Sequence, residues 1–198
     1  MIPYGLMSVA TTDVAVCTNV CIARKSDAAK LPQVATPGYY EQNVRVETQL
    51  AYALLAKLLW DDMGVRYNAS EIIVSKKGKP QHRSRSYYFS YAHTKDFVAC
   101  AVSEHDVGLD LEQSRVIPAK LHHKFLTPKE IQAQVDPLHA WVVKEAYSKL
   151  VGEGLGLGFS NYSAYDLLDK TCHLIHQQDD YVLAVFCGNL TEFSVSEL

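Results

Sequence analysis

The chain has 198 residues, of which 48% are hydrophobic and 21% are charged, as in an ordinary globular protein with a sizeable core. The formal net charge of −3 argues against a protein that binds polyanions, so any phosphate site must be built locally. The N-terminus has neither a basic flank nor a membrane-length apolar run, so we expect no targeting or membrane segment there. Five scattered cysteines are expected to be reduced, mostly buried thiols, which favours a cytoplasmic location.

The first half of the chain predicts strands around one long helix. A strand is expected over residues 13–23 and, after a loop, a helix over residues 43–63, because apolar residues recur at every fourth position from Val46 to Leu58. The next expected elements are strands over residues 71–75, 87–92 and 97–103, with a basic turn at 76–80.

The second half repeats this order of elements, with only faint similarity in residue identity. The expected elements are a strand over 107–112, a helix over 137–151, a glycine-rich exit over 152–159, and strands over 162–168, 172–176 and 181–186. The repeat predicts an α+β fold of two similar halves, residues 1–103 and 104–198, packed about a pseudo-two-fold axis with a cleft between them.

The strand candidate VGLDLE carries two acids. Successive side chains of an extended chain point to opposite faces, so Asp110 and Glu112 share one face, with Cα atoms roughly 6.6 Å apart. Two negative charges this close repel each other strongly when they are partly desolvated. A cation between them would make the electrostatic energy of the site favourable. The alternative is a half-exposed strand with an ordinary wet acidic face.

The helix candidate 137–151 supplies a third carboxylate. Trp141, Glu145 and Lys149 are spaced four residues apart and therefore lie on one face. An exposed Glu–Lys pair at this spacing is usually only helix decoration. Together with the two strand acids, however, Glu145 would complete a set of oxygen ligands suited to Mg²⁺, which keeps several waters and shares its sites with substrate phosphates.

Basic residues elsewhere could face a phosphate. Three lysines crowd the turn 76–80, although a solvated hairpin tip explains them equally well. His93 ends a strand candidate, and a structural histidine is the alternative there. Arg45 begins the first long helix, where backbone N–H groups and the helix dipole favour an anion; the alternative is an ordinary surface arginine.

Other motifs give little functional information. The glycines of GEGLGLGF follow a helix instead of joining a strand to one, so they predict a helix stop and not a dinucleotide site. Cys172, His173 and His176 lie close together in the sequence, with little support for a zinc site. The sequence contains no Walker-type phosphate loop, HExxH, CxxC pair or GxSxG motif.

Five stretches occur in an order that is typical of one enzyme family. They are Gly78-Lys79-Pro80, FSYAHTK, VGLDLE, KFLT with Glu130, and WVVKEAYSK. Together they resemble the 4′-phosphopantetheinyl transferases, in particular the Sfp type that activates carrier proteins of peptide, polyketide and fatty-acid synthesis. The resemblance covers about residues 74–160. Outside this range the chain resembles the family only in expected architecture.

The resemblance implies a reaction between coenzyme A and an apo carrier protein. A carrier serine would attack the β-phosphorus of coenzyme A, take up 4′-phosphopantetheine and release adenosine 3′,5′-bisphosphate. Asp110, Glu112 and Glu145 are implied to hold Mg²⁺ on the pyrophosphate. Lys149 is implied to stabilise the pyrophosphate and the leaving group. Catalysis by positioning and charge neutralisation suits phosphoryl transfer.

The N-terminal half is implied to bind the adenosine end of coenzyme A. The implied contacts are Arg45 at the 3′-phosphate, Lys79 and Pro80 at the adenine end, and His93, with Thr94 beside it, at a phosphate. The family commonly has a serine before this histidine, whereas this chain has Ala92. We expect either that Ser90 or Thr94 compensates for the missing hydroxyl group or that coenzyme A binds more weakly. The basic residues available upstream of Arg45 are Arg24, Lys25 and Lys30.

The proton acceptor for the carrier serine is open between Glu145, Glu130 and a metal-bound water. A metal-bound carboxylate is a poor base, so Glu130 is favoured, because the resemblance implies a glutamate at the edge of the metal site. The sequence T-P-K-E equally predicts a helix start in which Thr127 and Glu130 form a capping box.

The carrier is expected to dock on the run KLHHKFLTPKE. Its basic residues are Lys120, His122, His123, Lys124 and Lys129, with Phe125 and Leu126 as apolar anchors. We expect a monomer without nucleic-acid or membrane partners. The alternatives are another Mg²⁺-dependent enzyme that cleaves nucleotide pyrophosphates, and a non-catalytic module that binds carrier proteins or nucleotides.

Overall fold

The computed structural model describes residues 17–40 and 44–198. The strands are β1 (Cys17–Arg24), β2 (Ile72–Val74), β3 (Pro80–His82), β4 (Tyr88–His93), β5 (Phe97–Ser103), β6 (Val107–Gln113), β7 (Cys172–Gln177), β8 (Tyr181–Cys187) and β9 (Glu192–Glu197). The α-helices are α1 (Val46–Met63), α2 (Ala119–His122), α3 (Pro128–Gln132), α4 (Pro137–Val151) and α5 (Ala164–Lys170). Short 3₁₀ turns cover Lys25–Lys30, Ala69–Glu71, Gly154–Leu157 and Phe159–Asn161. No helix within the described ranges is long and apolar enough to span a bilayer.

The strands form two larger sheets and one hairpin. One sheet has the order β4-β5-β1-β9, the other has the order β6-β8-β7, and β2 pairs only with β3. All of these pairs are antiparallel except that of β1 with β9, which is parallel. In both sheets the order of the strands differs from their order along the chain. β5 lies between β1 and β4 in one sheet, and β8 lies between β6 and β7 in the other.

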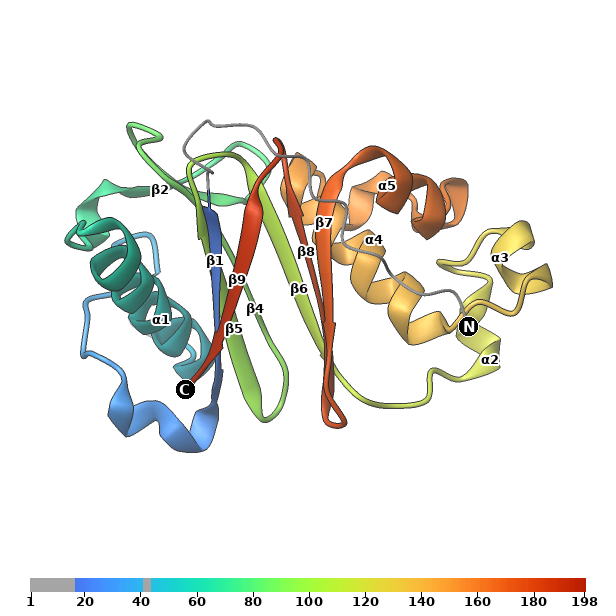
Figure 1. Cartoon of the computed structure of the whole chain (residues 1–198), viewed down its shortest axis with the longest axis horizontal. Helices are drawn as coiled ribbons and strands as arrows, with labels where there is room; N and C mark the ends of the chain where they lie inside the picture. The colour runs from blue at the N-terminus through green and yellow to red at the C-terminus, as the bar shows by residue number, and fades with distance from the viewer. Residues whose placement is uncertain (1–16, 41–43) are drawn as a thin grey trace.

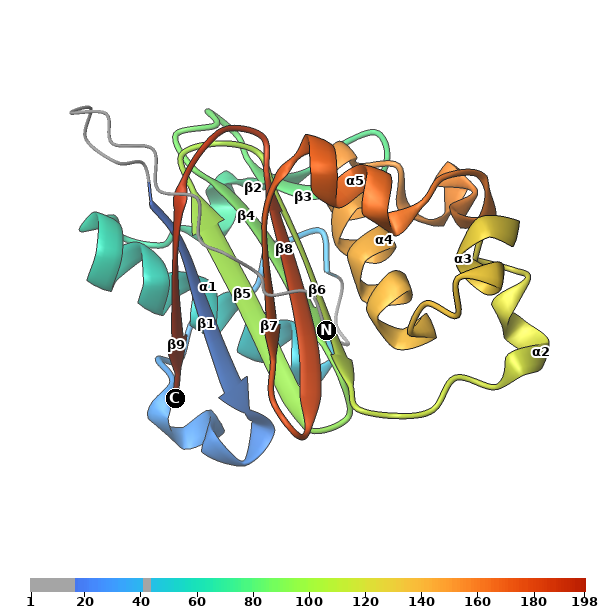
Figure 2. The same cartoon turned by 45° about the vertical axis from the view of Figure 1, so that its right-hand side comes forward.

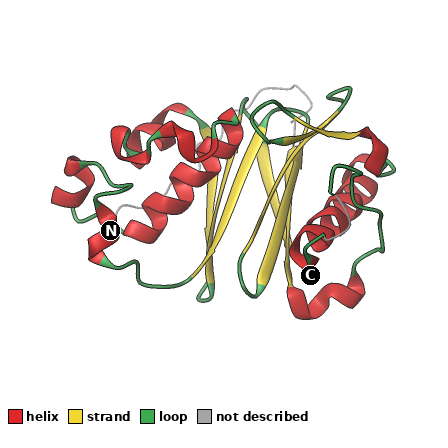
Figure 3. Ribbon diagram, turned by 180° about the vertical axis from the view of Figure 1, so that it is seen from behind, coloured by secondary structure: helices red, strands yellow, loops and turns green. Residues whose placement is uncertain are grey.

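Helices cover the outer faces of the sheets. Figure 1 shows the strands in the middle of the molecule, with α1 on one side and α4 and α5 on the other. The view in Figure 2 keeps α4 and α5 on the side of β7 and β8, and Figure 3 shows the same arrangement from behind. The molecule is therefore layered as helix, sheet, sheet and helix.

Buried apolar side chains fill each of the three interfaces. The alternation along β1 sends Cys21 and Ala23 toward α1, and Val20 and Ile22 toward the other sheet. Leu109 and Leu111 of β6 meet the same central core, while α4 packs on the opposite side of its sheet. The apolar residues of β6 thus face the other sheet, and the opposite face of β6 is left for α4.

The long helices begin and end where local signals predict. Asp136 caps α4, because its Oδ1 accepts hydrogen bonds from the backbone N–H groups of Leu138 and His139 at 2.8 and 3.2 Å. Gly152 ends α4 in the left-handed conformation, with a φ of 72°. The helices predicted over 43–63 and 137–151 are confirmed, with residue 43 outside the described part of the chain.

Two sequence-based assignments differ from the structure. The strand predicted over 162–168 is wrong, because this segment forms α5: Ser163 accepts a hydrogen bond from the backbone N–H of Tyr165, and Ala164 and Leu167 are buried on one helical face. The strand β9 was not predicted, and it joins the sheet of the first half although it lies beyond residue 104. Of the strand predicted over 13–23, residues 13–16 lie outside the described residues.

Candidate active site

The close approach of β6 and α4 depends on Gly108. A Cβ atom at Gly108 would lie 2.2 Å from both the carbonyl oxygen of Ala146 and the backbone nitrogen of Leu150. These are backbone atoms of a packed helix and cannot move aside cheaply. A glycine at this position therefore lets the acidic face of β6 lie directly against α4.

Asp110 and Lys149 form an ion pair across this contact. The Lys149 Nζ donates to Asp110 Oδ1 at 2.7 Å, and Asp110 is only 7% exposed. Burial raises the pKa of Asp110 above its ordinary value, even though Lys149 opposes the shift. The second oxygen, Oδ2, is buried and has no hydrogen-bond partner among the described residues. Asp110 therefore retains an acceptor that the protein does not satisfy.

Glu112 points toward the same helix. Its Oε1 accepts a hydrogen bond from the indole Nε1 of Trp141 at 3.0 Å, and its Oε2 pairs with Arg115 at 3.2 Å. The prediction that Asp110 and Glu112 share one face is thus confirmed, as is the common face of Trp141 and Lys149 on α4.

Glu145 lies on α4 between these two contacts. No hydrogen bond or ion pair joins its carboxylate to another described residue. Burial, together with the negative charges of Asp110 and Glu112, raises the pKa of Glu145 to about 7, although Lys149 acts in the opposite direction. Lys149 pairs with Asp110 and Arg115 pairs with Glu112, so Glu145 is the one of these three carboxylates without an ion pair among the described residues.

The carboxyl groups of this cluster favour a bound cation, but their present arrangement is too open to hold one. Asp110 has a buried acceptor without a donor among the described residues, and burial and the neighbouring acids disfavour the charged form of Glu145, which a bound cation would favour. Within the described ranges, however, no three His, Cys, Asp or Glu side chains are grouped closely enough to hold a metal ion. A cation would therefore have to draw the carboxylates together.

Basic side chains from the first half lie near the same cluster. Desolvation lowers the pKa of His93, Glu47 opposes this shift, and the positive charges of Lys25, Lys149 and Arg45 add to it. Arg45 occupies the N-cap position of α1, as predicted. The influence of these charges on one imidazole indicates that the 3₁₀ turn Lys25–Lys30, the N-cap of α1, the end of β4 and α4 bring basic groups into one neighbourhood.

The hydroxyl groups near His93 already bind backbone groups. The Ser90 Oγ accepts a hydrogen bond from the backbone N–H of Leu109 at 3.0 Å and so links β4 to β6. The Thr94 Oγ1 accepts from the N–H groups of Asp96 and Phe97 in the turn after β4. Ala92 is buried in the core between the sheets. Each hydroxyl therefore has a structural role beside any contact with a phosphate.

Lys79 is engaged by the protein itself. Its Nζ donates to the carbonyl oxygens of Val107 and Leu150, both at 3.1 Å, and its side chain is only 19% exposed. Pro80, the first residue of β3, is half-buried. The ammonium group predicted to face the adenine end of coenzyme A is thus held at the junction of β6 and α4.

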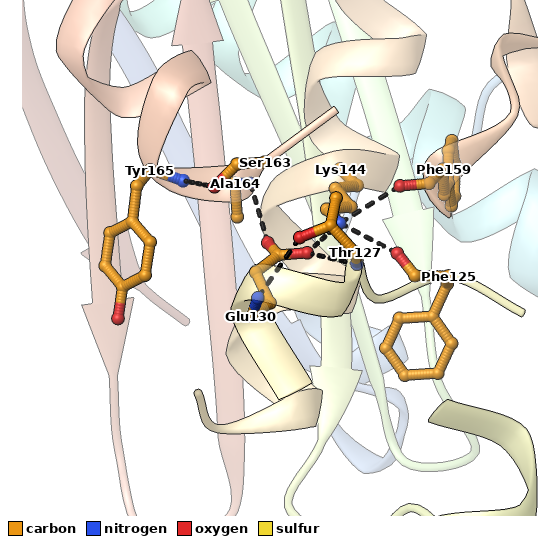
Figure 4. Close-up of polar contacts among 8 residues, drawn as sticks. All are labelled: Phe125, Thr127, Glu130, Lys144, Phe159, Ser163, Ala164 and Tyr165. Atoms are coloured by element: carbon orange, nitrogen blue, oxygen red, sulfur yellow. Dashed lines mark hydrogen bonds and ion pairs between the residues drawn. The ribbon is translucent and has the colours of Figure 1, made fainter. Parts of the chain in front are cut away.

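Glu130 lies in a buried network shown in Figure 4. Its Oε2 accepts from the backbone N–H of Thr127 and from the Lys144 Nζ, both at 2.7 Å, and its Oε1 accepts from Ala164 N at 2.8 Å. Burial alone would raise the pKa of Glu130, but these three donors outweigh it and lower the pKa. The capping box is confirmed. A carboxylate so occupied is not placed to take a proton from a substrate.

The predicted docking run is only partly exposed. Lys120, His123, Lys124 and Lys129 are exposed on α2, α3 and the segment between them. Phe125 and Leu126 are 4% and 3% exposed, because they pack in the core beneath α4, so their prediction as surface anchors is wrong. The exposed apolar residues beside these lysines in the sequence include Val116, at 92%, and Ile131, at 46%.

A separate cavity lies in the first half of the molecule. It has a volume of about 710 Å³ and is lined by Gly38, Tyr39, Ala69, Ser70 and the three residues of β2. None of the predicted site residues lines it.

The family model of the 4′-phosphopantetheinyl transferase superfamily matches residues 106–193. This segment belongs to the 4′-phosphopantetheinyl transferase superfamily. The resemblance found from the sequence motifs is thereby confirmed. The matched transferase segment contains Asp110, Glu112, Glu130, Glu145 and Lys149, whereas the basic residues of the first half precede it.

Curated transferases show the same similarity. The 4′-phosphopantetheinyl transferase psf-1 of Bacillus pumilus is 32% identical over 97 residues, which are 44% of this chain and 42% of the relative. The transferase gsp of Aneurinibacillus migulanus is 27% identical over 149 residues, or 69% and 61%. The transferase Sfp of Bacillus subtilis strain 168 is 28% identical over 85 residues, or 38% of each. The chain spans about half the length of the curated relatives it matches.

Two residues near the transferase cluster were not singled out from the sequence. Lys25 was one of three candidates upstream of Arg45, and only its ion pair with Glu47 at 2.8 Å places it beside His93. Tyr162 has a buried hydroxyl without a partner among the described residues, and burial and the charge of Glu145 raise its pKa. No sequence signal marks Tyr162, because its position depends on how the segment after α4 folds back.

Proposed function

We propose that this protein transfers 4′-phosphopantetheine from coenzyme A to a serine of an apo carrier protein, in a Mg²⁺-dependent reaction that releases adenosine 3′,5′-bisphosphate. The carrier serine oxygen forms the new bond to the β-phosphorus, and the bond to the bridging oxygen breaks. The observation that carries the proposal is the Asp110–Lys149 pair with Glu112 and Glu145 beside it, inside the segment that matches the family.

We further propose that the two sheets and their helices are equivalent halves about a pseudo-two-fold axis. The strand order supports this, because β5 lies between β1 and β4 in one sheet and β8 lies between β6 and β7 in the other. Coenzyme A would bind where the halves meet, near β4, β6 and α4. The contribution of Lys25, Arg45 and His93 from one half and Lys149 from the other supports a site between them.

Asp110, Glu112 and Glu145 are proposed to hold the Mg²⁺ ion. The unsatisfied Oδ2 of Asp110 would offer one ligand, and the carboxylate of Glu145, which has no hydrogen-bond or ion-pair partner among the described residues, would offer a second. When bound, Mg²⁺ neutralises charge on the pyrophosphate. Lys149, which balances Asp110 here, would then donate to the pyrophosphate and to the leaving bisphosphate.

The N-terminal half is proposed to bind the nucleotide. His93 and Thr94 would lie at a phosphate, Arg45 at the 3′-phosphate, and Pro80 at the adenine end. Lys25 joins this group, because it lies close enough to His93 for its charge to lower the pKa of the imidazole. Several cations around one phosphate attract it more strongly than a single cation does, and the helix dipole at the N-terminus of α1 adds to this attraction.

A water molecule beside Glu145 is proposed to accept the proton of the carrier serine, because Glu145, as a proposed metal ligand, is a poor base. A proton acceptor must keep a lone pair that no other donor occupies, and this water molecule would keep one. Glu130 does not meet this requirement, since both its oxygens are occupied by hydrogen-bond donors. We therefore assign Glu130 to the capping box and to its pair with Lys144.

The exposed lysines on α2 and α3 are proposed to bind an acidic carrier surface, with Val116 as the apolar contact in place of Phe125 and Leu126. Lys120, Lys124 and Lys129 concentrate positive charge on a chain whose net charge is −3. We also keep the monomer and the cytoplasmic location within the proposal, the latter supported by five cysteines that are all free.

Intact-mass spectrometry of an apo carrier protein tests the proposed function. The carrier is incubated with the protein, coenzyme A and Mg²⁺. We expect a gain of one phosphopantetheine group on the carrier. Hydrolysis of coenzyme A or of nucleotides with an unchanged carrier mass would indicate a pyrophosphate-cleaving enzyme instead, and binding without turnover would indicate a non-catalytic module. Either of these results would overturn the proposal.

A further inference from the structure

The hairpin β2–β3 is too small to hold its own position. It has only three residue pairs and joins neither of the larger sheets. An isolated two-stranded hairpin is marginally stable in water, so its place in the fold must come from contacts outside it. Ile72 is buried against the core beside α1, which fixes the end of the hairpin that lies away from the turn. The turn end, residues 75–79, needs a second attachment.

Lys79 provides that attachment. Its Nζ donates to Val107 O and Leu150 O, both at 3.1 Å, and lies 3.7 Å from a carboxylate oxygen of Asp106. A Cβ atom at Gly152 would lie 3.8 Å from the Lys79 Cδ, so the aliphatic stem passes over the end of α4. The backbone N–H of Lys79 donates to Ser75 Oγ at 3.0 Å, which fixes the turn around it.

The two carbonyl groups that accept from Lys79 belong to the elements of the candidate site. Leu150 lies in the last turn of α4, where carbonyl groups lack helical partners and the helix dipole favours a cation. Val107 is the first residue of β6. Gly108, which permits the close contact of β6 and α4, follows Val107 directly. The ammonium group therefore joins three elements at one end of the β6–α4 contact.

We propose that Lys79 is a positioning residue that ties the hairpin β2–β3 to the β6–α4 contact, and that it is not a phosphate ligand. The inference rests on the proposed function for its catalytic consequence, because it concerns how the hairpin with Pro80 is held beside the Asp110–Lys149 pair. Donation of Lys79 to a phosphate would require it to leave two backbone carbonyl groups unsatisfied in a buried place, which is costly.

Lys79→Met tests this role, with Lys77→Met as the matched control. Methionine keeps most of the aliphatic stem and removes the donors. Lys77 lies on the same turn but forms an exposed ion pair with Glu153, which contributes little. The first readout is hydrogen exchange of residues 72–83 without substrate. We expect exchange about tenfold faster in Lys79→Met, corresponding to the loss of charged hydrogen bonds, and near-wild-type exchange in Lys77→Met.

The second readout compares coenzyme A with its 3′-dephospho form. A positioning role predicts that Lys79→Met lowers kcat by a similar factor with both substrates, and that Lys79→Arg, which keeps N–H donors, recovers part of the loss. Unchanged hydrogen exchange, or a KM increase confined to coenzyme A with its 3′-phosphate, would overturn the inference. If the wild-type protein transfers nothing, the proposed function fails, whereas the exchange measurement still decides whether Lys79 holds the hairpin.

Discussion

At the scale of single residues, the candidate site contains acids that lack the partners expected of buried carboxyl groups. Asp110 has one buried oxygen without a donor among the described residues, and no hydrogen bond or ion pair joins the carboxylate of Glu145 to another described residue. Buried polar groups are nearly always satisfied, so each exception calls for an explanation. Lys149 balances only one of the three carboxylates. We interpret the imbalance as the mark of a site that awaits a cation and an anionic substrate.

Glu145→Gln should change how stability depends on pH. The pKa of Glu145 is raised to about 7 in the folded protein from an ordinary value of 4.5. Between these values the folded protein keeps a proton that the unfolded chain has released, so the wild-type protein loses stability as pH rises through this window. The free energy of unfolding, measured without Mg²⁺, should therefore fall by on the order of 2 kcal/mol more in wild type than in Glu145→Gln between pH 5 and pH 8. Parallel pH curves would contradict the assignment.

Arg45→Ala should weaken recognition of the 3′-phosphate. The guanidinium group lies at the N-cap of α1, near the basic neighbourhood of His93. We expect the KM for coenzyme A to rise about tenfold, the scale of one lost charged hydrogen bond, while the KM for 3′-dephospho-coenzyme A stays near its wild-type value. A variant that still discriminates fully between the two substrates would remove Arg45 from this role.

Sequence reasoning predicted on which face of the strand or helix each of these residues lies, but not which residues pair with one another. Strand alternation put Asp110 and Glu112 on one side, and helical spacing put Trp141, Glu145 and Lys149 on another, because both periods are properties of the local backbone. That Lys149 binds Asp110, or that Lys79 reaches Leu150 O, depends on how closely whole elements pack. The approach distance is set in part by Gly108, whose meaning is visible only in three dimensions.

At the scale of elements, one buried ion pair fastens α3 and α5 to α4. Lys144 donates to Glu130 and to the carbonyl oxygens of Phe125 and Phe159, and Glu130 accepts from the first residue of α5 (Figure 4). Both side chains are almost fully buried. Lys144 precedes Glu145 in α4, so the network holds the segment that presents Glu145 to β6.

Glu130→Gln should destabilise the fold more than it slows catalysis. Loss of the carboxylate leaves the buried Lys144 ammonium without its counter-charge, which typically costs about 3 kcal/mol or more. Asp61→Asn is the matched control, because it removes the exposed pair with Lys57 and should cost less than about 1 kcal/mol. Urea unfolding gives both values, and kcat of the folded Glu130→Gln protein should stay within a few-fold of wild type. A hundredfold lower kcat at unchanged stability would instead return Glu130 to the role of base.

The elements that sequence reasoning missed are those fixed by distant contacts. The segment after Ser163 was assigned to a strand because aromatic and apolar residues recur there, yet Ser163 is also a standard N-cap residue. The helix is favoured because Ala164 N donates to Glu130 and because Leu167 packs in the core beneath α4. No strand was predicted over the residues of β9, which pairs in parallel with β1, a segment distant from it in the sequence.

At the scale of the whole molecule, basic residues are concentrated in particular places although the net charge is negative. The chain is acidic overall, yet exposed lysines gather on α2, α3 and the segment between them, and Lys25, Arg45 and Lys149 act on His93 near the candidate site. In Figure 1 the helices α2 and α3 lie at the end of the molecule that is farthest from α1. A partner bound there would meet the α4 side of the site, while a nucleotide would approach from the side of α1 and β4.

Carrier binding should depend on salt. Exposed charges are screened over about 8–10 Å at physiological ionic strength, so we expect the KM for an acidic carrier to rise several-fold between low and moderate salt. The paired change Lys120→Ala and Lys124→Ala should flatten this dependence, whereas Lys57→Ala on α1 should not. A carrier KM that is independent of salt in the wild-type protein would place the docking surface elsewhere.

The central claim is that the carboxylate and lysine cluster between β6 and α4 performs transfer to a carrier protein. Loading of an apo carrier, followed by intact-mass spectrometry with Mg²⁺ and coenzyme A, tests it most directly when wild type is compared with Asp110→Ala, Glu112→Ala and the exposed control Asp61→Ala. We predict complete loading by wild type and Asp61→Ala, a loss of loading in both strand variants with folding retained, and no loading by wild type after removal of Mg²⁺. Near-wild-type loading by Asp110→Ala or Glu112→Ala would contradict the account.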